Sequence, residues 1–132
     1  MPANPEVAEW VGKATEDYQG ALALMRQRAR PLPSLVCFHT QQCVEKYLKA
    51  ALLFYGQSFP KTHDLIELYE LCLPFLPELN DIFEAISVVS PYSVEARYPG
   101  APNTVEEAQE AVEAMKCVRE FFKKRLEEEE QD

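Results

Sequence analysis

The sequence predicts an all-α protein, an antiparallel up-and-down helical bundle of about five helices, three long and two short. Apolar residues recur at helical spacing over three long segments, and no segment alternates convincingly between apolar and polar residues as a strand would. The connections between the segments are brief, which is typical of antiparallel neighbours in a bundle. Because no long linker divides the chain, we expect one domain over residues 1–126, followed by an acidic, disordered tail over residues 127–132.

The first two long helices are bounded by residues that commonly start and stop helices. Asn4 is suited to the N-cap position and Pro5 to the first helical position. The helix is expected to end near Arg28, because the Arg-Pro-Leu-Pro run that begins two residues later cannot continue it. Ser34 is the expected N-cap of the second helix, and Gly56 is its expected C-terminal stop.

Two short helices are expected next, and they are separated by prolines. Asp64 and Glu67 have the spacing of a capping box and mark the start of the first of these helices. Pro74 and Pro77 interrupt it, and a second helical segment is expected from about Leu79 to Val89.

The last helix has the clearest start signal in the sequence. Thr104 and Glu107 form a capping box, and an apolar stripe follows from Val105 to Leu126. The preceding segment, residues 90–102, contains three prolines and a glycine and is therefore expected to be a loop.

Composition excludes several classes of function. The net charge of −9 argues against general DNA or RNA affinity, although the final EEEEQD holds five of the acids and leaves about −4 on the body. No leader and no apolar run of bilayer length is seen, so we expect a cytoplasmic protein without a membrane segment. The four cysteines are expected to be reduced, and neither a metal site nor a cofactor is predicted. The cysteines lie at positions 37, 43, 72 and 117.

The second helix carries a polar wedge that includes Gln42, Glu45, Lys46 and Lys49. The ordinary interpretation is a solvated helix face, with Glu45 four residues before Lys49 in the favourable orientation for an ion pair. Gln41 does not fit that interpretation, because it lies at the edge of the apolar arc, where an amide needs hydrogen-bond partners. Those partners belong to another helix, to a second subunit or to a ligand, and the sequence leaves these three alternatives open.

Several of these stretches together resemble the HEPN domain family. They are FHTQQCVEKYLKAAL, KTHDL and ARYP, with Trp10, Ala14 and Asp17 in the first helix, over about residues 8–125. The resemblance implies an up-and-down bundle that is usually dimeric and is similar to the substrate-binding domain attached to some nucleotidyltransferases. It also implies pairing with a minimal nucleotidyltransferase, because stand-alone members are often encoded beside one as a toxin–antitoxin module.

Many members of this family are metal-independent RNases with an arginine followed within a few residues by a histidine. The sequence departs from that signature, because no histidine follows Arg97 and no arginine lies at the required distance from His39 or His63. An endoribonuclease would need Arg97 as the cation beside the developing phosphorane and His63 as the proton acceptor. The leading hypothesis is therefore an accessory subunit that binds a nucleotide or nucleotidyl acceptor. An atypical RNase toxin and a plain dimeric interaction module are the alternatives.

The side chains expected to contact a ligand come from four segments. Arg97 can hold a phosphate and Tyr98 can stack on a base, but Arg97 can equally lock its loop to Asp17 or Glu45. A partner for Asp17 is expected, either Arg97 or Lys46, whereas His63 has loop packing as its structural alternative. We expect these groups to converge on one cleft, within a protomer or between two protomers. The predicted ligand-binding residues are Arg97, Tyr98, Lys46, Lys49, Gln42, Gln41, Asp17 and His63.

Overall fold

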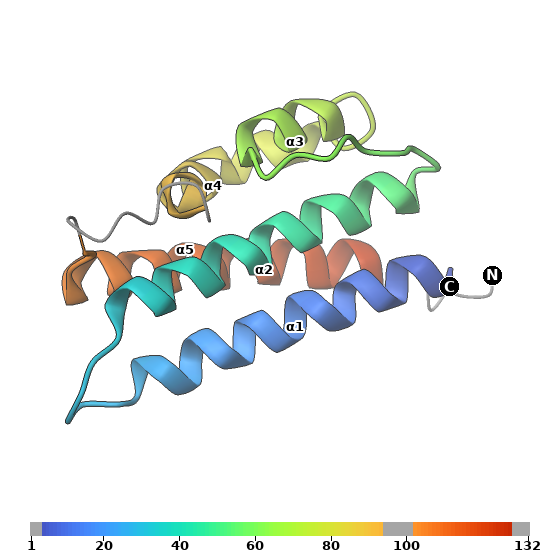
Figure 1. Ribbon diagram of the computed structural model, residues 1–132. Helices are drawn as coiled ribbons and strands as arrows, with labels where there is room; N and C mark the ends of the chain where they lie inside the picture. Colours follow the sequence, from blue (N-terminus) through green and yellow to red (C-terminus); the bar gives the residue numbers. More distant parts are fainter. Residues whose placement is uncertain (1–3, 94–101, 128–132) are drawn as a thin grey trace.

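The computed structural model of the protein describes residues 4–93 and 102–127. Every regular element within these residues is a helix, which confirms the all-α prediction. Helix α2 occupies the middle of the bundle, with α1 on one side, α3 and α4 on the other and α5 behind it (Figure 1). The helices are α1 (Pro5–Met25), α2 (Pro33–Phe54), α3 (Leu65–Cys72), α4 (Phe83–Val89) and α5 (Val105–Phe122).

Helix α1 runs antiparallel to both α2 and α5 (Figure 1), and the short connection between α1 and α2 predicts the first of these arrangements. Two short 3₁₀ segments flank α4, over Pro77–Ile82 and Ser90–Tyr92. A π-helical turn over Lys123–Glu127 extends α5. Within the described ranges, no helix has the length and apolar content needed to cross a bilayer.

The predicted N-caps of three helices are confirmed. Asn4 Oδ1 accepts a hydrogen bond of 2.9 Å from the backbone at the start of α1. Asp64 Oδ1 accepts two such bonds at the start of α3. Thr104 and Glu107 form both halves of the capping box of α5, at 3.0 and 2.8 Å. Each cap satisfies backbone N–H groups that have no partner inside the helix, so local sequence alone marks these starts.

Other helix ends differ from the predictions. Helix α1 ends at Met25, three residues before Arg28. Ser34 does not cap α2, because the helix already starts at Pro33 with Leu32 in the N-cap position. Ser34 Oγ instead accepts a hydrogen bond of 2.9 Å from the backbone N–H of Asn103, which ties the entrance of α5 to the start of α2.

The predicted helix over Leu79–Val89 is divided in two. Its first part belongs to the 3₁₀ segment Pro77–Ile82, and α4 begins only at Phe83. The C-terminal stop of α2 agrees with the prediction, since Gly56 has a φ of 75°, a left-handed conformation that glycine adopts without strain.

The core surrounds α2, because four other helices pack against it. Tyr47 of α2 stacks on Phe122 of α5 with ring centroids 5.5 Å apart. All four cysteines are free thiols. Cys37 and Cys43 of α2 and Cys72 of α3 are buried, whereas Cys117 is exposed. Burial raises the pKa of Cys37 and of Cys72 to about 12, so both thiols stay protonated and unreactive at neutral pH.

Candidate functional site

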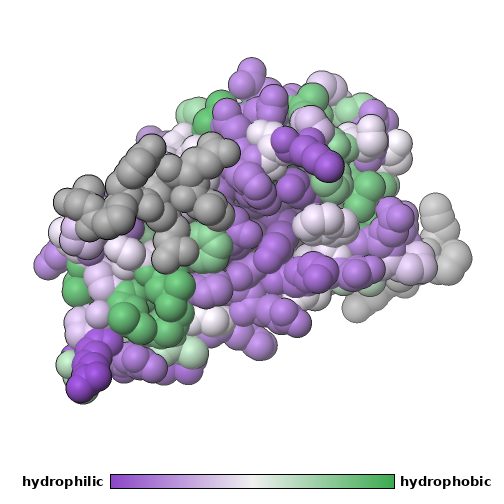
Figure 2. Space-filling view, in the orientation of Figure 1, coloured by the Kyte–Doolittle hydropathy of each residue, from purple (hydrophilic) through white to green (hydrophobic). Residues whose placement is uncertain are grey.

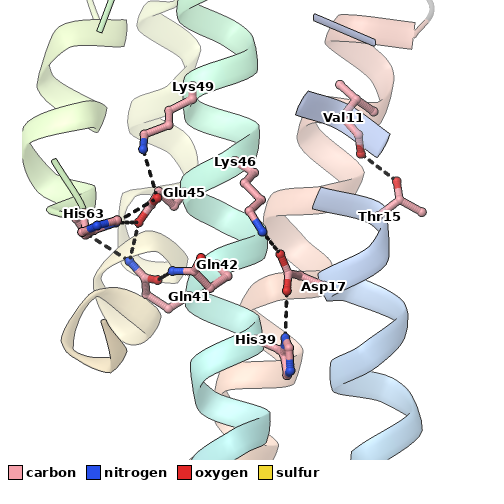
Figure 3. A network of polar contacts seen from close by, with 10 residues as sticks. All are labelled: Val11, Thr15, Asp17, His39, Gln41, Gln42, Glu45, Lys46, Lys49 and His63. Atoms are coloured by element: carbon pink, nitrogen blue, oxygen red, sulfur yellow. Dashed lines mark hydrogen bonds and ion pairs between the residues drawn. The ribbon is translucent and has the colours of Figure 1, made fainter. Parts of the chain in front are cut away.

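Polar side chains gather on the part of α2 that faces α1 and the connection leading to α3 (Figure 3). In the space-filling view, hydrophilic residues form a band across the middle of the same face, with apolar patches to either side (Figure 2). We term this group the α2 polar cluster. Its members are Asp17, His39, Gln41, Gln42, Glu45, Lys46, Lys49 and His63.

One half of the cluster joins α1 to α2, and we term it the Asp17 unit, made of Asp17, His39 and Lys46. Asp17 Oδ1 lies 2.8 Å from His39 Nδ1, and its other carboxylate oxygen pairs with Lys46 Nζ. Because a carboxylate only accepts hydrogen bonds, His39 Nδ1 is the donor, which leaves Nε2 as the outer nitrogen. Lys46 is thus one of the two partners that the sequence analysis considered for Asp17.

The other half joins α2 to His63, which lies at the end of the connection that leads to α3. We term this half the Glu45 unit, and it is made of Gln41, Glu45, Lys49 and His63. Glu45 Oε2 accepts a hydrogen bond of 3.1 Å from Lys49 Nζ, and Glu45 Oε1 lies 3.0 Å from His63 Nδ1. As in the Asp17 unit, the carboxylate makes Nδ1 the donor and leaves Nε2 outward.

Gln41 connects the members of the Glu45 unit. Its Nε2 donates to Glu45 Oε1 at 3.3 Å and to the backbone oxygen of His63 at 3.0 Å. Its own oxygen accepts a hydrogen bond of 2.8 Å from Gln42 Nε2. The buried amide therefore finds its partners in its own helix and in the connection before α3, not on another helix as one of the alternatives expected.

Two aromatic rings cover the lysine of the Glu45 unit. Lys49 Nζ lies 5.6 Å from the ring centroid of Trp10 and 5.2 Å from that of Phe59, within reach of a cation–π attraction. The expectation of a solvated wedge is wrong for Glu45 and Lys49, because both are buried. Trp10 of α1 and Phe59 of the α2–α3 connection close over the wedge from distant parts of the sequence.

The charges of the cluster are largely balanced from within. Lys46 compensates Asp17, and Lys49 compensates Glu45, so neither lysine is an isolated point charge for a phosphate. The histidine side chains are more exposed than the charged side chains that they accompany, and His63 is more exposed than His39. In the described part of the chain, the Nε2 atoms of both rings make no hydrogen bond. Either ring can accept a proton at Nε2 or, once protonated, donate a hydrogen bond from it.

Several predicted positions lie outside the described residues. Arg97 and Tyr98 belong to residues 94–101, so their expected convergence with α2 stays a prediction. The acidic tail from residue 128 onward is outside as well. Among the residues that the structure covers, no group of three or more His, Cys, Asp or Glu side chains is arranged to hold a metal ion.

His39 is the member of the cluster that sequence reasoning missed. In the sequence analysis it was considered for the arginine–histidine signature of the RNases, which it does not complete. A usable signal was present, since His39 shares its helix face with Gln42, Lys46 and Lys49 at intervals of three and four residues. Phe59 was missed too, but a single aromatic residue in an irregular connection carries no periodic signal.

Comparisons with known proteins agree with this fold. A crystal structure of TT1696 from Thermus thermophilus matches with a TM-score of 0.73 and 26% identity, covering 91% of this chain and 98% of that one. A crystal structure of ST0689, described as an archaeal HEPN homologue, matches with a TM-score of 0.66 and 22% identity, covering 96% and 99% of the two chains. No curated protein matches the sequence. The family model of the HEPN domain matches residues 7–127, so the chain belongs to the HEPN domain family.

Proposed function

We propose that this HEPN protein is an accessory subunit that binds a phosphorylated nucleotide, or the acceptor of a nucleotidyl group, at the α2 polar cluster. One observation carries the proposal. Two imidazole rings on the same cluster are each held through Nδ1 by a carboxylate of low exposure, and each leaves Nε2 without a partner in the described residues. Such paired orientation is the usual way in which a protein aims an imidazole at a ligand.

A contribution to stability does not by itself explain why the cluster contains buried charges. Burying a carboxylate and an ammonium costs several kcal/mol of desolvation per ion, and well-packed apolar side chains are often at least as stabilising. Glu45 and Lys49 are nevertheless both buried, and their network ends on the exposed ring of His63. The network therefore supports a role in positioning that ring.

The charge distribution favours a small phosphorylated ligand over a long nucleic acid. Protonated Nε2–H groups and the partly exposed Lys46 provide donors for one or two phosphate groups. A chain of net charge −9 repels an extended polyanion, since nucleic-acid affinity depends on many cations facing the backbone. In this proposal Arg97 and Tyr98 complete the site as a further cation and a stacking ring, the roles that their side-chain chemistry allows.

Calorimetric titration of the pure protein with ATP, GTP and a short RNA tests this function. We expect binding of a nucleotide, weakened at least about tenfold by His39→Ala or His63→Ala, because a hydrogen bond to a charged group contributes about 1.5–3 kcal/mol. Lys61→Ala is the matched control, since Lys61 is an exposed cation two residues from His63 and outside the network. Flat traces with all three ligands would instead favour a plain dimeric interaction module.

The proposal includes assembly as a homodimer that pairs with a minimal nucleotidyltransferase. Co-expression with the product of the neighbouring gene tests this part separately from ligand binding. We expect a transferase to co-elute through an affinity step and a sizing column. A neighbouring transferase that never co-elutes would remove the docking partner while leaving the nucleotide site to be judged by calorimetry.

An RNase is the second candidate, and the contact between His63 and Glu45 favours it. An imidazole that is oriented through Nδ1 by a carboxylate is arranged to take a proton at Nε2, as attack by a 2′-hydroxyl requires. Arg97 would supply the cation. Incubation of total RNA with the protein in EDTA should then give cleavage that both His63→Ala and Arg97→Ala abolish. Intact RNA, or cleavage that persists in both variants, would exclude this activity.

A further inference from the structure

A second recess lies at the end of the bundle where α1 joins α2, and it shares no residue with the α2 polar cluster. It has a volume of about 1120 Å³, above the usual range of pockets for small molecules. α1 contacts α5 far less than it contacts α2, and the recess opens between the last turn of α1 and the start of α5. In Figure 2 apolar residues are exposed at this end of the molecule, next to strongly hydrophilic ones at its tip.

The recess is a groove in which apolar and polar side chains both line the walls. Its α5 side spans about three helical turns, or about 16 Å, on one helix face. The α5 residues on this side are Val105, Ala108, Gln109, Val112, Glu113 and Lys116. Leu22 and Met25 of α1 line the opposite side. Val105, Ala108 and Val112 form the apolar row of the α5 side, and Val105 is 38% exposed, so part of the apolar surface is uncovered.

The rim of the groove is basic in a strongly acidic protein. Arg26, Arg28 and Lys116 line it, against a single acid, Glu113, which lies 3.7 Å from Lys116. Arg26 and Arg28 are exposed and, within the residues that the structure describes, make no ion pair. Arg30 adds a further exposed cation to the same connection. The whole chain has a net charge of −9, so the excess of cations on this rim, two of them without an ion pair in the described residues, is a local feature that attracts an anionic partner.

We propose that this groove docks an acidic amphipathic helix of a partner protein. The α5 side of the groove extends over about three turns, and leucine, methionine and valine supply apolar lining that can contact the apolar face of a helix. The unpaired arginines of the rim would face acidic side chains on the flanks of that helix. None of the described lining residues is aromatic, so the groove offers no ring on which a nucleobase could stack.

Fluorescence anisotropy with two synthetic peptides tests the proposal. One labelled amphipathic helix carries leucine and alanine on one face and glutamate on the other, and its matched partner carries lysine in place of glutamate. We expect the acidic peptide to bind at least about tenfold more tightly than the basic one. The double variant Arg26→Glu with Arg28→Glu should remove or reverse that preference, and Val105→Asp should weaken binding of both peptides because it places a charge in the apolar row.

The control is the double variant Lys13→Glu with Lys61→Glu. It changes the net charge by the same amount at two exposed positions that do not line the groove. Equal affinity for the two peptides, or equal weakening by the control variant, would show that net charge rather than this groove decides binding. Equal competition by an oligonucleotide of the same charge would overturn the proposal in favour of a general anion patch. A homodimer that dissociates with Val105→Asp in sedimentation would overturn it in favour of a second copy of the chain.

Discussion

The Asp17 unit and the Glu45 unit contain the same chemistry in different surroundings. Each holds one carboxylate, one lysine and one histidine bonded through Nδ1. In the Glu45 unit the side chains of Glu45 and Lys49 are 4% and 8% exposed, whereas Asp17 and Lys46 are 11% and 22% exposed. The histidines follow the opposite order, with His39 at 27% and His63 at 49%. The more deeply buried ion pair, Glu45 with Lys49, thus holds the more exposed imidazole, that of His63.

Because the two units differ in burial, removing a charge from each should lower the stability of the fold by different amounts. A buried ion pair that loses one partner leaves an uncompensated charge, while a partly exposed lysine can turn toward water. The Glu45 unit should therefore dominate stability, and the Asp17 unit should tolerate change better.

Removal of the Glu45 charge tests the comparison most strongly. Glu45→Gln keeps the side-chain shape but leaves the Lys49 ammonium buried without a carboxylate. We expect it to lower the free energy of unfolding by about 3–5 kcal/mol, measured by urea denaturation followed by circular dichroism.

Two further variants complete this test. Glu70→Gln removes an exposed carboxylate from α3 and should change stability by less than about 0.5 kcal/mol. Adding Lys49→Met to Glu45→Gln should recover stability, since no buried charge then remains. A loss below about 1 kcal/mol in Glu45→Gln would mean that the pair behaves like a surface salt bridge, and the contrast between the units would fail.

The corresponding change in the Asp17 unit should have a smaller effect. Asp17→Asn removes the charge that Lys46 and His39 share, but both partners keep access to water. We expect a loss of about 1–3 kcal/mol in the same denaturation experiment. Glu16→Gln, at the exposed neighbouring position, is the control. A loss in Asp17→Asn that equals or exceeds that of Glu45→Gln would reverse the order that burial predicts.

The independence of the two units can be measured by combining their variants. No hydrogen bond or ion pair joins them in the described structure, although both are anchored on α2. The double variant Asp17→Asn with Glu45→Gln should therefore show additive losses within about 0.5 kcal/mol. A larger interaction energy would identify the α2 polar cluster as one cooperative network rather than two units.

Thiol labelling should resolve the smallest differences in local opening, because Cys43 lies close enough to feel the Asp17 charge and Cys72 is hydrogen-bonded to Leu48, the residue before Lys49. Burial raises the pKa of Cys43, and the Asp17 charge raises it further. Cys72 donates a weak hydrogen bond to the backbone oxygen of Leu48 on the other side of α2. In native protein at neutral pH we expect rapid labelling of the exposed Cys117 only. Asp17→Asn should then accelerate Cys43 selectively, and Glu45→Gln should accelerate Cys72.

Mass spectrometry of the labelled peptides measures each rate separately. Cys117 provides the internal standard, since its rate should not change between the variants. If Cys43 and Cys72 accelerated together in either variant, the opening would be global, and labelling would not distinguish the two units.

Much of the fold follows from local signals. Asn4, Asp64 and Thr104 each precede a helix because their side chains satisfy its first N–H groups, and Gly56 permits the backbone turn that ends α2. Ser34 shows where such signals fail, because it has the right chemistry for a cap but is bonded to a residue 69 positions away. Residue-by-residue propensity contains no information on that contact.

The candidate site was only partly predictable for the same reason. Gln41, Glu45 and Lys49 were singled out from their places on α2, and Lys46 was considered as a partner of Asp17. The burial of Glu45 and Lys49 and the role of His39 were not foreseen, because they depend on which segments cover α2. Trp10 and Phe59 close over one side of the wedge and Asp17 closes the other, and their positions are set by packing.

The sequence by itself determined the all-helical class, the three capped helix starts and the apolar stripes that require a bundle, since each depends on neighbours within about one or two helical turns. Only the tertiary structure decided which polar residues left the solvent. The solvation of a side chain depends on the segments that pack over its helix face. The sequence pattern of a polar helix face is the same whether that face contacts water or another part of the chain.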